Sequence, residues 1–231
     1  MICFLTSRTD FPDSDHLHLN PANGFVDELR RRLPAPCRAL FVCSDPENAE
    51  KMDFYAAALR TSFQNAGLPF DRLLSLDGRN EARAAALVRE ADLLILSGGH
   101  VPTQNRFFQR IGLKTLLRGF DGVLIGISAG SMNSAETVYA QPELPGEALD
   151  PEYRRFLPGL GLTGKMILPH YQEIRDDVLD GLRVMEDIAY PDSMGRRFYL
   201  LPDGSYILIA DGKEEIRGEA YLLADGVLSP L

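Results

Sequence analysis

The sequence lacks any apolar run close to the ~20 residues that a transmembrane helix needs. Its first residues, Met1-Ile2-Cys3-Phe4-Leu5, are typical of a buried strand. They have neither the basic leader nor the long apolar stretch of a signal peptide. We therefore expect no membrane partner and a cytoplasmic protein.

Cysteine and histidine are scarce. The three cysteines (Cys3, Cys37 and Cys43) lie in or beside apolar segments without metal-ligand spacing, which predicts buried, reduced thiols. The four histidines are scattered along the chain. The Gly-x-Gly-x-x-Gly fingerprint of a dinucleotide site does not occur. We therefore expect no metal and no other cofactor.

Basic residues are fewer than acidic ones. The sequence has 24 Lys and Arg residues and 33 Asp and Glu residues, which gives a formal net charge of −9. This balance argues against nucleic acid or an anionic membrane as a partner. The hydrophobic share of 45% and the charged share of 25% are those of an ordinary soluble globular protein. The sequence does not decide between a monomer and a homodimer.

Apolar runs and longer amphipathic segments alternate through the first half of the 231 residues. This pattern predicts an α/β fold with a doubly wound, mostly parallel sheet flanked by helices, and we expect one domain over residues 1–231. Expected strands cover 2–5, 38–43, 70–76, 92–96 and 122–127, and expected helices cover 23–33, 47–66, 81–91 and 104–117.

The second half has a different pattern. Residues 141–161 are rich in proline, glycine and acid and predict a long surface excursion. A strand over 165–168 and a helix over 174–186 are expected next. Four short apolar pieces then alternate with Asp-Gly turn signals, which predicts a C-terminal antiparallel β extension over 198–201, 206–210, 215–217 and 221–224.

The segment Val123–Ser131 carries the strongest functional signal. An apolar strand ends in Gly126-Ile127-Ser128-Ala129-Gly130, the Gly-x-Ser-x-Gly pattern of a nucleophile elbow. In such an elbow the chain turns sharply from strand to helix and leaves the serine at the apex. The same pattern also fits a tight turn without chemistry, so the partners of Ser128 decide between the two.

A serine nucleophile needs a base, and His170 is the best candidate because it follows an apolar strand in Ile167-Leu168-Pro169-His170. His16 and His18 lie in an early polar loop and are expected to be solvated. An acid is needed to orient the base. Glu136, Glu143, Glu147 and Asp150 all lie between Ser128 and His170.

Developing negative charge on the substrate oxygen needs N–H donors. Leu96-Ser97-Gly98-Gly99-His100 places two glycines directly after a buried strand, one strand–helix unit before the elbow. The N–H groups of Gly99 and Ala129 are therefore the expected oxyanion hole.

Three motifs together resemble peptidase E, a family of serine dipeptidases related to cyanophycinase within the class I glutamine amidotransferase-like superfamily. They are Leu96–Gly99, Gly126–Asn133 and Leu168–Tyr171, and the resemblance spans roughly residues 35–175. It implies an amidotransferase-like fold and hydrolysis of small peptides or amides. It also implies Ser128 as nucleophile, His170 as base and Gly99 with Ala129 as oxyanion hole.

The same resemblance implies Glu143 as the acid of a Ser-His-Glu triad, fifteen residues after the nucleophile (143 − 128 = 15). The stretch from Ser128 to His170 is longer than in the family, so Glu136 and Glu147 stay as alternatives. Cleavage after an N-terminal aspartate implies a substrate-binding cation, for which Arg175 is the nearest candidate, with Arg154 and Arg155 as alternatives. His100 stands where the family has asparagine, which implies a different substrate pocket with His100 among its binding residues.

Two other classes of function compete with a peptidase or amidase. An α/β-hydrolase esterase shares the elbow, but its histidine usually comes late, whereas 61 residues follow His170 here (231 − 170). A regulatory amidotransferase-like domain without peptidase activity is the third class. A glutamine amidotransferase is disfavoured because serine occupies the position of the catalytic thiol.

Overall fold

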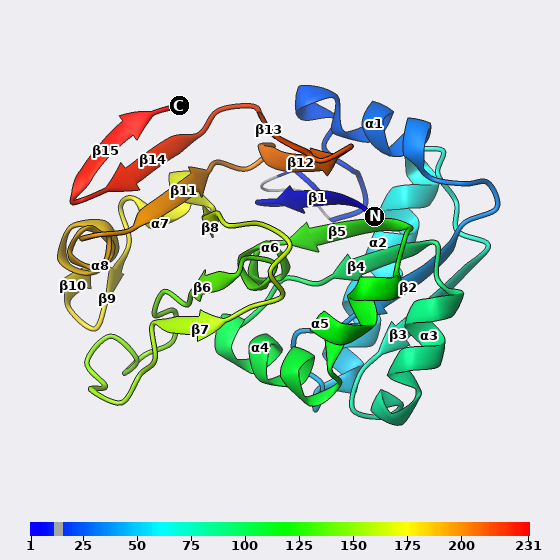
Figure 1. Ribbon diagram of the computed structural model, residues 1–231, viewed down its shortest axis with the longest axis horizontal. Helices are drawn as coiled ribbons and strands as arrows, with labels where there is room; N and C mark the ends of the chain where they lie inside the picture. The colour runs from blue at the N-terminus through cyan, green and yellow to red at the C-terminus, as the bar shows by residue number, and fades with distance from the viewer. Residues whose placement is uncertain (12–15) are drawn as a thin grey trace.

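The computed structural model describes residues 1–11 and 16–231. Its centre is a seven-stranded sheet in the order β13-β12-β1-β5-β4-β2-β3 (Figure 1). The five N-terminal strands of this sheet are parallel to one another. They are β1 Ile2–Thr6, β2 Arg38–Val42, β3 Arg72–Leu76, β4 Leu93–Leu96 and β5 Val123–Ile127. The mostly parallel sheet predicted from the sequence is confirmed.

Helices connect and flank these strands. The α-helices are α1 Phe25–Arg32, α2 Ala49–Asn65, α3 Ala84–Glu90, α4 Val101–Arg110, α5 Leu113–Leu116 and α6 Ala129–Asn133. Short 3-10 turns are η1 Ala22–Gly24, η2 Glu81–Arg83 and η3 Leu117–Gly119. Helix α2 begins where the Asn48 side chain accepts the N–H of Lys51, and it buries Met52, Leu59 and Phe63 at helical spacing.

A second sheet has four strands in the order β15-β14-β11-β8. They are β8 Met166–Pro169, β11 Arg197–Leu201, β14 Tyr221–Ala224 and β15 Val227–Pro230. Strands β8 and β11 are parallel, whereas β14 is antiparallel to both β11 and β15. Strands β12 Tyr206–Ala210 and β13 Lys213–Arg217 are antiparallel and join the central sheet beside β1. The expected antiparallel C-terminal strands are therefore present, divided between the two sheets.

The prediction of a helix over 174–186 is wrong. The structure has α7 Tyr171–Ile174, a hairpin of β9 Val178–Leu179 and β10 Leu182–Arg183, a π-helical turn η4 Val184–Ala189 and α8 Tyr190–Asp192. The hairpin turn is Asp180-Gly181, with φ of 53° and 82°. Positive φ at both residues is the signature of a two-residue hairpin loop, and this Asp-Gly signal outweighs the helical pattern.

The surface excursion after α6 contains one small strand pair. Strand β6 Thr137–Tyr139 is antiparallel to β7 Phe156–Pro158, and residues 141–155 form the loop between them. The buried Tyr139 ring stacks on Phe198 of β11, with 4.2 Å between ring centroids. This contact places the excursion against the second sheet.

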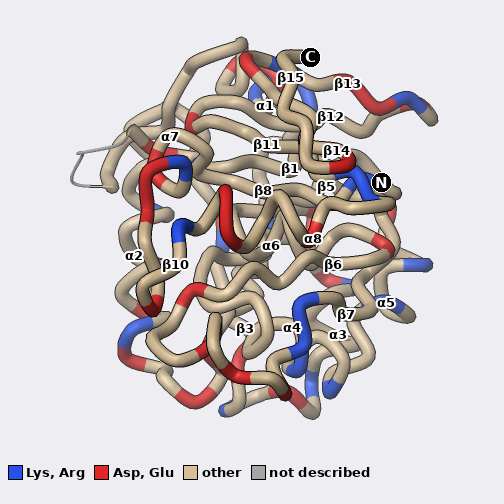
Figure 2. Tube along the Cα trace, turned by 90° about the vertical axis from the view of Figure 1, so that its left-hand side faces the viewer, with Lys and Arg blue, Asp and Glu red and all other residues tan. Residues whose placement is uncertain are grey.

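In the part of the chain that the structure describes, no helix has the length and apolar character to cross a membrane. Along the chain trace in Figure 2, Lys and Arg positions alternate with acidic and uncharged ones.

Candidate functional site

Ser128 lies at a sharp turn between β5 and α6, with φ 50° and ψ −111°. Glycine is required on both sides because the backbone passes very close to its neighbours. A Cβ on Gly130 would come within 2.3 Å of the Leu96 carbonyl oxygen, and one on Gly126 within 2.9 Å of the Ser131 nitrogen. The elbow predicted from Gly-x-Ser-x-Gly therefore has the expected backbone.

The end of β1 holds this elbow in place. The Thr6 carbonyl accepts the Ser128 N–H at 3.1 Å and the Ser131 hydroxyl at 2.7 Å, and the Thr6 hydroxyl donates to the Gly126 carbonyl at 2.8 Å. The Ser128 hydroxyl itself has no hydrogen-bond partner among residues 1–11 and 16–231. It is therefore available to a ligand.

Ser128 and His170 line the same cavity, which has a volume of about 440 Å³. The cavity lies at the carboxyl ends of β1, β4 and β5, where Ser7, Gly98 and Ser128 follow the strands, and Lys51 and Tyr55 of α2 form another wall. This is the edge at which doubly wound sheets bind ligands.

His170 is paired with Asp203. The His170 Nδ1 lies 2.8 Å from Asp203 Oδ1, and the Asp203 side chain is only 3% exposed. The parallel register of β8 and β11 explains the contact. Pro169 lies opposite Leu201, so His170 and Asp203 follow neighbouring strand ends at the same edge. A carboxylate at this distance fixes the orientation of an imidazole ring.

Three groups surround the Asp203 carboxylate. Ser7 donates a hydrogen bond to Oδ1 at 2.6 Å, and an Arg8 guanidinium nitrogen lies 3.4 Å from Oδ2. Burial opposes the negative charge, but the hydrogen bonds from His170 and Ser7 and the charges of His170 and Arg8 outweigh it. They hold the pKa of Asp203 below its ordinary value, so the carboxylate is ionised at neutral pH.

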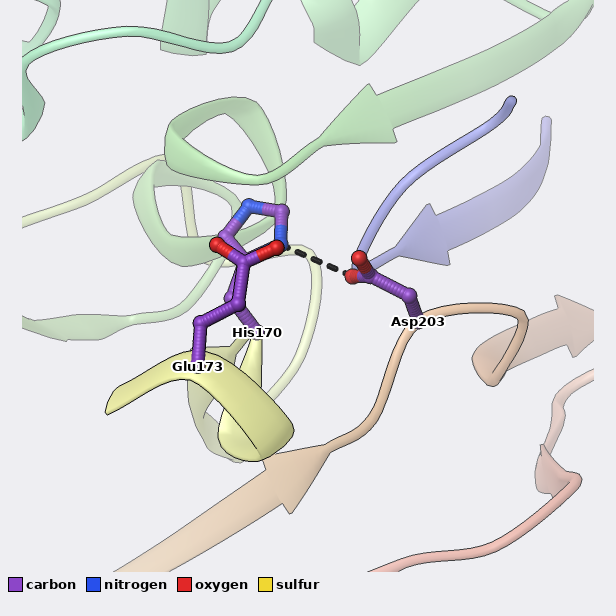
Figure 3. A group of neighbouring side chains, drawn as sticks. All are labelled: His170, Glu173 and Asp203. Carbon is purple, nitrogen blue, oxygen red and sulfur yellow. Dashed lines mark hydrogen bonds and ion pairs between the residues drawn. The ribbon is translucent and has the colours of Figure 1, made fainter. Parts of the chain in front are cut away.

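Glu173 of α7 joins His170 and Asp203 in a group with the composition and spacing of metal ligands (Figure 3). Arg8 lies 3.5 Å from the exposed Glu173 carboxylate and 3.4 Å from that of Asp203. The guanidinium already supplies positive charge to both acids. These contacts favour an ion-pair network over a metal site.

The Gly98-Gly99 turn closes the cavity near the elbow. A Cβ on Gly98 would lie 3.4 Å from the Ser128 Cβ, and Gly99 has φ of 144° with Ser44 Oγ 2.3 Å from its would-be Cβ. Only glycine fits position 99 without strain. In the described residues the N–H groups of Gly99 and Ala129 have no protein acceptor. Both predicted donors are therefore free.

Glu143 does not contact His170, and the expected pairing of these two residues is corrected to His170 with Asp203. Glu143 is an exposed residue whose backbone N–H donates to Glu147, and the charge of Glu147 acts on its carboxyl. Packing around the carboxyl and this like charge raise the pKa of Glu143 above its ordinary value. The residue fifteen positions after Ser128 lies in the 141–155 loop. The acid that contacts His170 instead follows the end of β11.

His100 is also placed differently from the expectation. Its Nδ1 lies 2.8 Å from the Thr103 hydroxyl and its Nε2 lies 2.8 Å from Glu147 Oε1. Both ring nitrogens are thus occupied within the protein, and His100 is outside the cavity lining. His100 thus connects the 141–155 loop to the start of α4. These contacts do not support the expected role of His100 in substrate binding.

Arg175 and Glu136 are likewise outside the cavity lining. Arg175 is exposed at the end of α7 and pairs with Asp176 at 3.0 Å, and Glu136 is exposed after α6. Arg155 pairs with Asp192 at 2.8 Å. Among residues 1–11 and 16–231, Arg8 and Lys51 are the arginine and the lysine that line the cavity, and the sequence did not single them out.

The sequence marks Asp203 only as part of an Asp-Gly turn signal. Asp203-Gly204 is one of the Asp-Gly pairs that follow the expected antiparallel strands, here the strand over 198–201. Because β11 is parallel to β8, its carboxyl end faces the same edge as His170. Strand direction, which the sequence pattern does not give, decides the role of this acid.

The fold and the elbow thus define an α/β protein of the amidotransferase-like class. The model of Peptidase family S51 matches residues 4–217, so the chain belongs to this family of peptidases, the peptidase E family. Membership of this family supports the conclusion that the chain is a serine peptidase.

A solved structure has a similar fold, that of a "Putative Peptidase E Protein" from Listeria monocytogenes EGD-e. The two are 18% identical with a TM-score of 0.63, and the similarity covers 94% of this chain and 97% of the other. A comparison with curated protein sequences gives no match.

Proposed function

We propose that the protein is a serine hydrolase of the peptidase E type that cleaves small peptides or amides through an acyl-enzyme on Ser128. The observation that carries this proposal is one cavity that contains the elbow serine and a histidine whose Nδ1 is held by a buried aspartate. His170 is the proposed base and Asp203 the proposed orienting acid, which makes the triad Ser128-His170-Asp203.

The contacts of His170 support its proposed part in the reaction. With Nδ1–H donated to Asp203, Nε2 carries the free lone pair and accepts the Ser128 proton as Oγ attacks the substrate carbonyl. The N–H groups of Gly99 and Ala129 stabilise the resulting oxyanion. The imidazolium then gives its proton to the leaving amine. In the second half-reaction a water gives its proton to His170 and attacks the acyl group, which releases the acid and regenerates the Ser128 hydroxyl.

Cavity size and lining favour a small substrate. A volume of about 440 Å³ fits a dipeptide-sized molecule and not a folded chain. Arg8 is paired with acids, whereas Lys51 is paired with none among the described residues and lies 6.0 Å from the Tyr55 ring centroid. Lys51 therefore favours a substrate with a carboxylate, as the dipeptides of the peptidase E family have.

Labelling with a fluorophosphonate probe tests the nucleophile without assuming a substrate. We expect one adduct per chain on Ser128 and none in Ser128→Ala, with unchanged thermal unfolding. We also expect hydrolysis of a panel of Asp-x dipeptide amides by the wild type only. Turnover of short esters with inert amides would instead indicate an esterase, and an unlabelled, inactive wild type would indicate a regulatory domain.

A further inference from the structure

Ser7 directly follows β1 and is completely buried, yet it lies against both members of the His170–Asp203 pair. Its hydroxyl donates to Asp203 Oδ1 at 2.6 Å and accepts the backbone N–H of His170 at 2.8 Å. Its own backbone N–H donates to the Ser205 carbonyl at 3.3 Å. The Ser7 hydroxyl thus contacts the backbone N–H of His170, the ring Nδ1 of His170 at 3.5 Å and the carboxylate of Asp203.

The donor and acceptor directions follow from the number of protons. A hydroxyl has one proton, and the Asp203 carboxylate can only accept, so the Ser7 proton points to Oδ1. A lone pair of Ser7 then remains for the His170 N–H. Oδ1 therefore receives two hydrogen bonds, one from Ser7 and one from His170 Nδ1. Rotation of the carboxylate would break both.

The backbone of His170 needs such an anchor. Its φ of 56° and ψ of 36° lie in the left-handed region that residues with a Cβ rarely adopt. The hydrogen bond from its N–H to Ser7 stabilises this conformation at the point where β8 ends and α7 begins. The imidazole direction depends on it, because the ring is attached one bond beyond the strained Cα.

From these contacts we propose that Ser7 is a positioning residue of the hydrolytic site, whose single hydroxyl fixes both the backbone of His170 and the carboxylate of Asp203. The proposal rests on the proposed function of Ser128 and His170. The Ser7 hydroxyl donates its proton to Asp203 rather than to a base, so Ser7 is not the proposed nucleophile. It acts through His170, by keeping Nδ1–H on Asp203 and Nε2 directed to the cavity.

The test compares Ser7→Ala with Ser7→Thr, which keeps the hydroxyl, and with Ser193→Ala. Ser193 is a matched control because it is completely buried, donates to the Tyr190 carbonyl at 2.7 Å and accepts the Gly226 N–H at 2.9 Å. It is outside the cavity lining. All variants are first checked for thermal unfolding.

Two readouts are measured in each variant: the downfield proton resonance of His170 Nδ1–H and the rate of fluorophosphonate labelling of Ser128. In Ser7→Ala we expect the resonance to shift or broaden by exchange with water, and labelling to slow at least tenfold. Ser7→Thr is expected to recover the resonance and most of the rate, and Ser193→Ala to keep both.

An unchanged resonance in folded Ser7→Ala, or equal slowing in Ser7→Ala and Ser193→Ala, would overturn the proposal. The resonance does not depend on activity. If wild-type Ser128 is not labelled, the proposed function fails, and the resonance still decides whether Ser7 holds the pair.

Discussion

At the scale of single residues, the contacts of His170 separate two acids that the sequence could not distinguish. Asp203 is bonded to the ring and nearly completely buried, whereas Glu143 lies in the 141–155 loop and bonds to Glu147 through its backbone. An orienting carboxylate acts by holding the tautomer of the histidine, so only the acid in contact should affect the chemistry.

We expect Asp203→Asn to lower kcat by roughly a thousandfold or more, because an amide no longer selects the Nδ1–H tautomer. The matched change Glu143→Gln should leave kcat within about twofold. Steady-state kinetics on one dipeptide amide measures both. A large loss in Glu143→Gln with a normal Asp203→Asn would restore the original pairing.

The elbow glycines make a second prediction at this scale. Gly130→Ala places a Cβ 2.3 Å from the Leu96 carbonyl, so α6 must shift away from β4. We expect a loss of about 1–3 kcal/mol in the free energy of unfolding, together with reduced labelling of Ser128. Urea denaturation measures the stability. Gly119→Ala, where a Cβ meets nothing within 4 Å, is the control.

At the scale of elements, two carboxylates hold residues 143–148 of the 141–155 loop. Glu147 accepts from His100 of the α4 start and from the N–H groups of Glu143 and Leu144. Asp180 of the β9–β10 turn accepts from the N–H groups of Gly146 and Ala148. Carboxylates thus replace the backbone partners that a loop without secondary structure lacks.

Glu147→Ala should therefore loosen this loop. We expect faster amide hydrogen exchange over residues 141–155, with unchanged protection in the central sheet. Exchange measured by mass spectrometry tests this expectation. Glu152→Ala, an exposed glutamate of the same loop, should change exchange much less, and equal effects of the two substitutions would contradict the role of Glu147.

The helices and strands show which parts of the fold the sequence patterns predict. The five parallel strands and the elbow follow from apolar runs and glycine spacing, because a strand buried on both faces has almost no alternative. The β9–β10 hairpin was missed since its strands have only two residues each. Asp203 was missed for another reason: its position depends on which strand lies beside β8, and that is a property of the tertiary structure.

At the scale of the whole molecule, the N-terminal cysteines belong to the core around the central sheet. Cys3, Cys37 and Cys43 are free and buried, and burial raises the pKa of their thiols to about 12, 11 and 12. A thiol must ionise to react, so folded protein keeps all three unreactive. A single domain, a cytoplasmic location and a monomer or homodimer stay predictions.

Thiol labelling provides a test at this scale. We expect a thiol reagent at pH 8 to modify none of the three cysteines in folded protein and all three in denaturant. Hydrolysis should be insensitive to the reagent. Rapid modification of one native cysteine with loss of activity would contradict a serine mechanism.

Two neighbouring residues at the end of β1 position Ser128 and the His170–Asp203 pair relative to each other. The Thr6 carbonyl holds the turn that carries Ser128, and the next side chain, Ser7, holds His170 and Asp203. The separation of nucleophile and base is thus set across one planar peptide unit, the stiffest part of any chain. The contacts of Thr6 and Ser7 do not involve the loop over residues 141–155, whereas one residue inserted between positions 6 and 7 would displace Ser128 relative to His170 and Asp203.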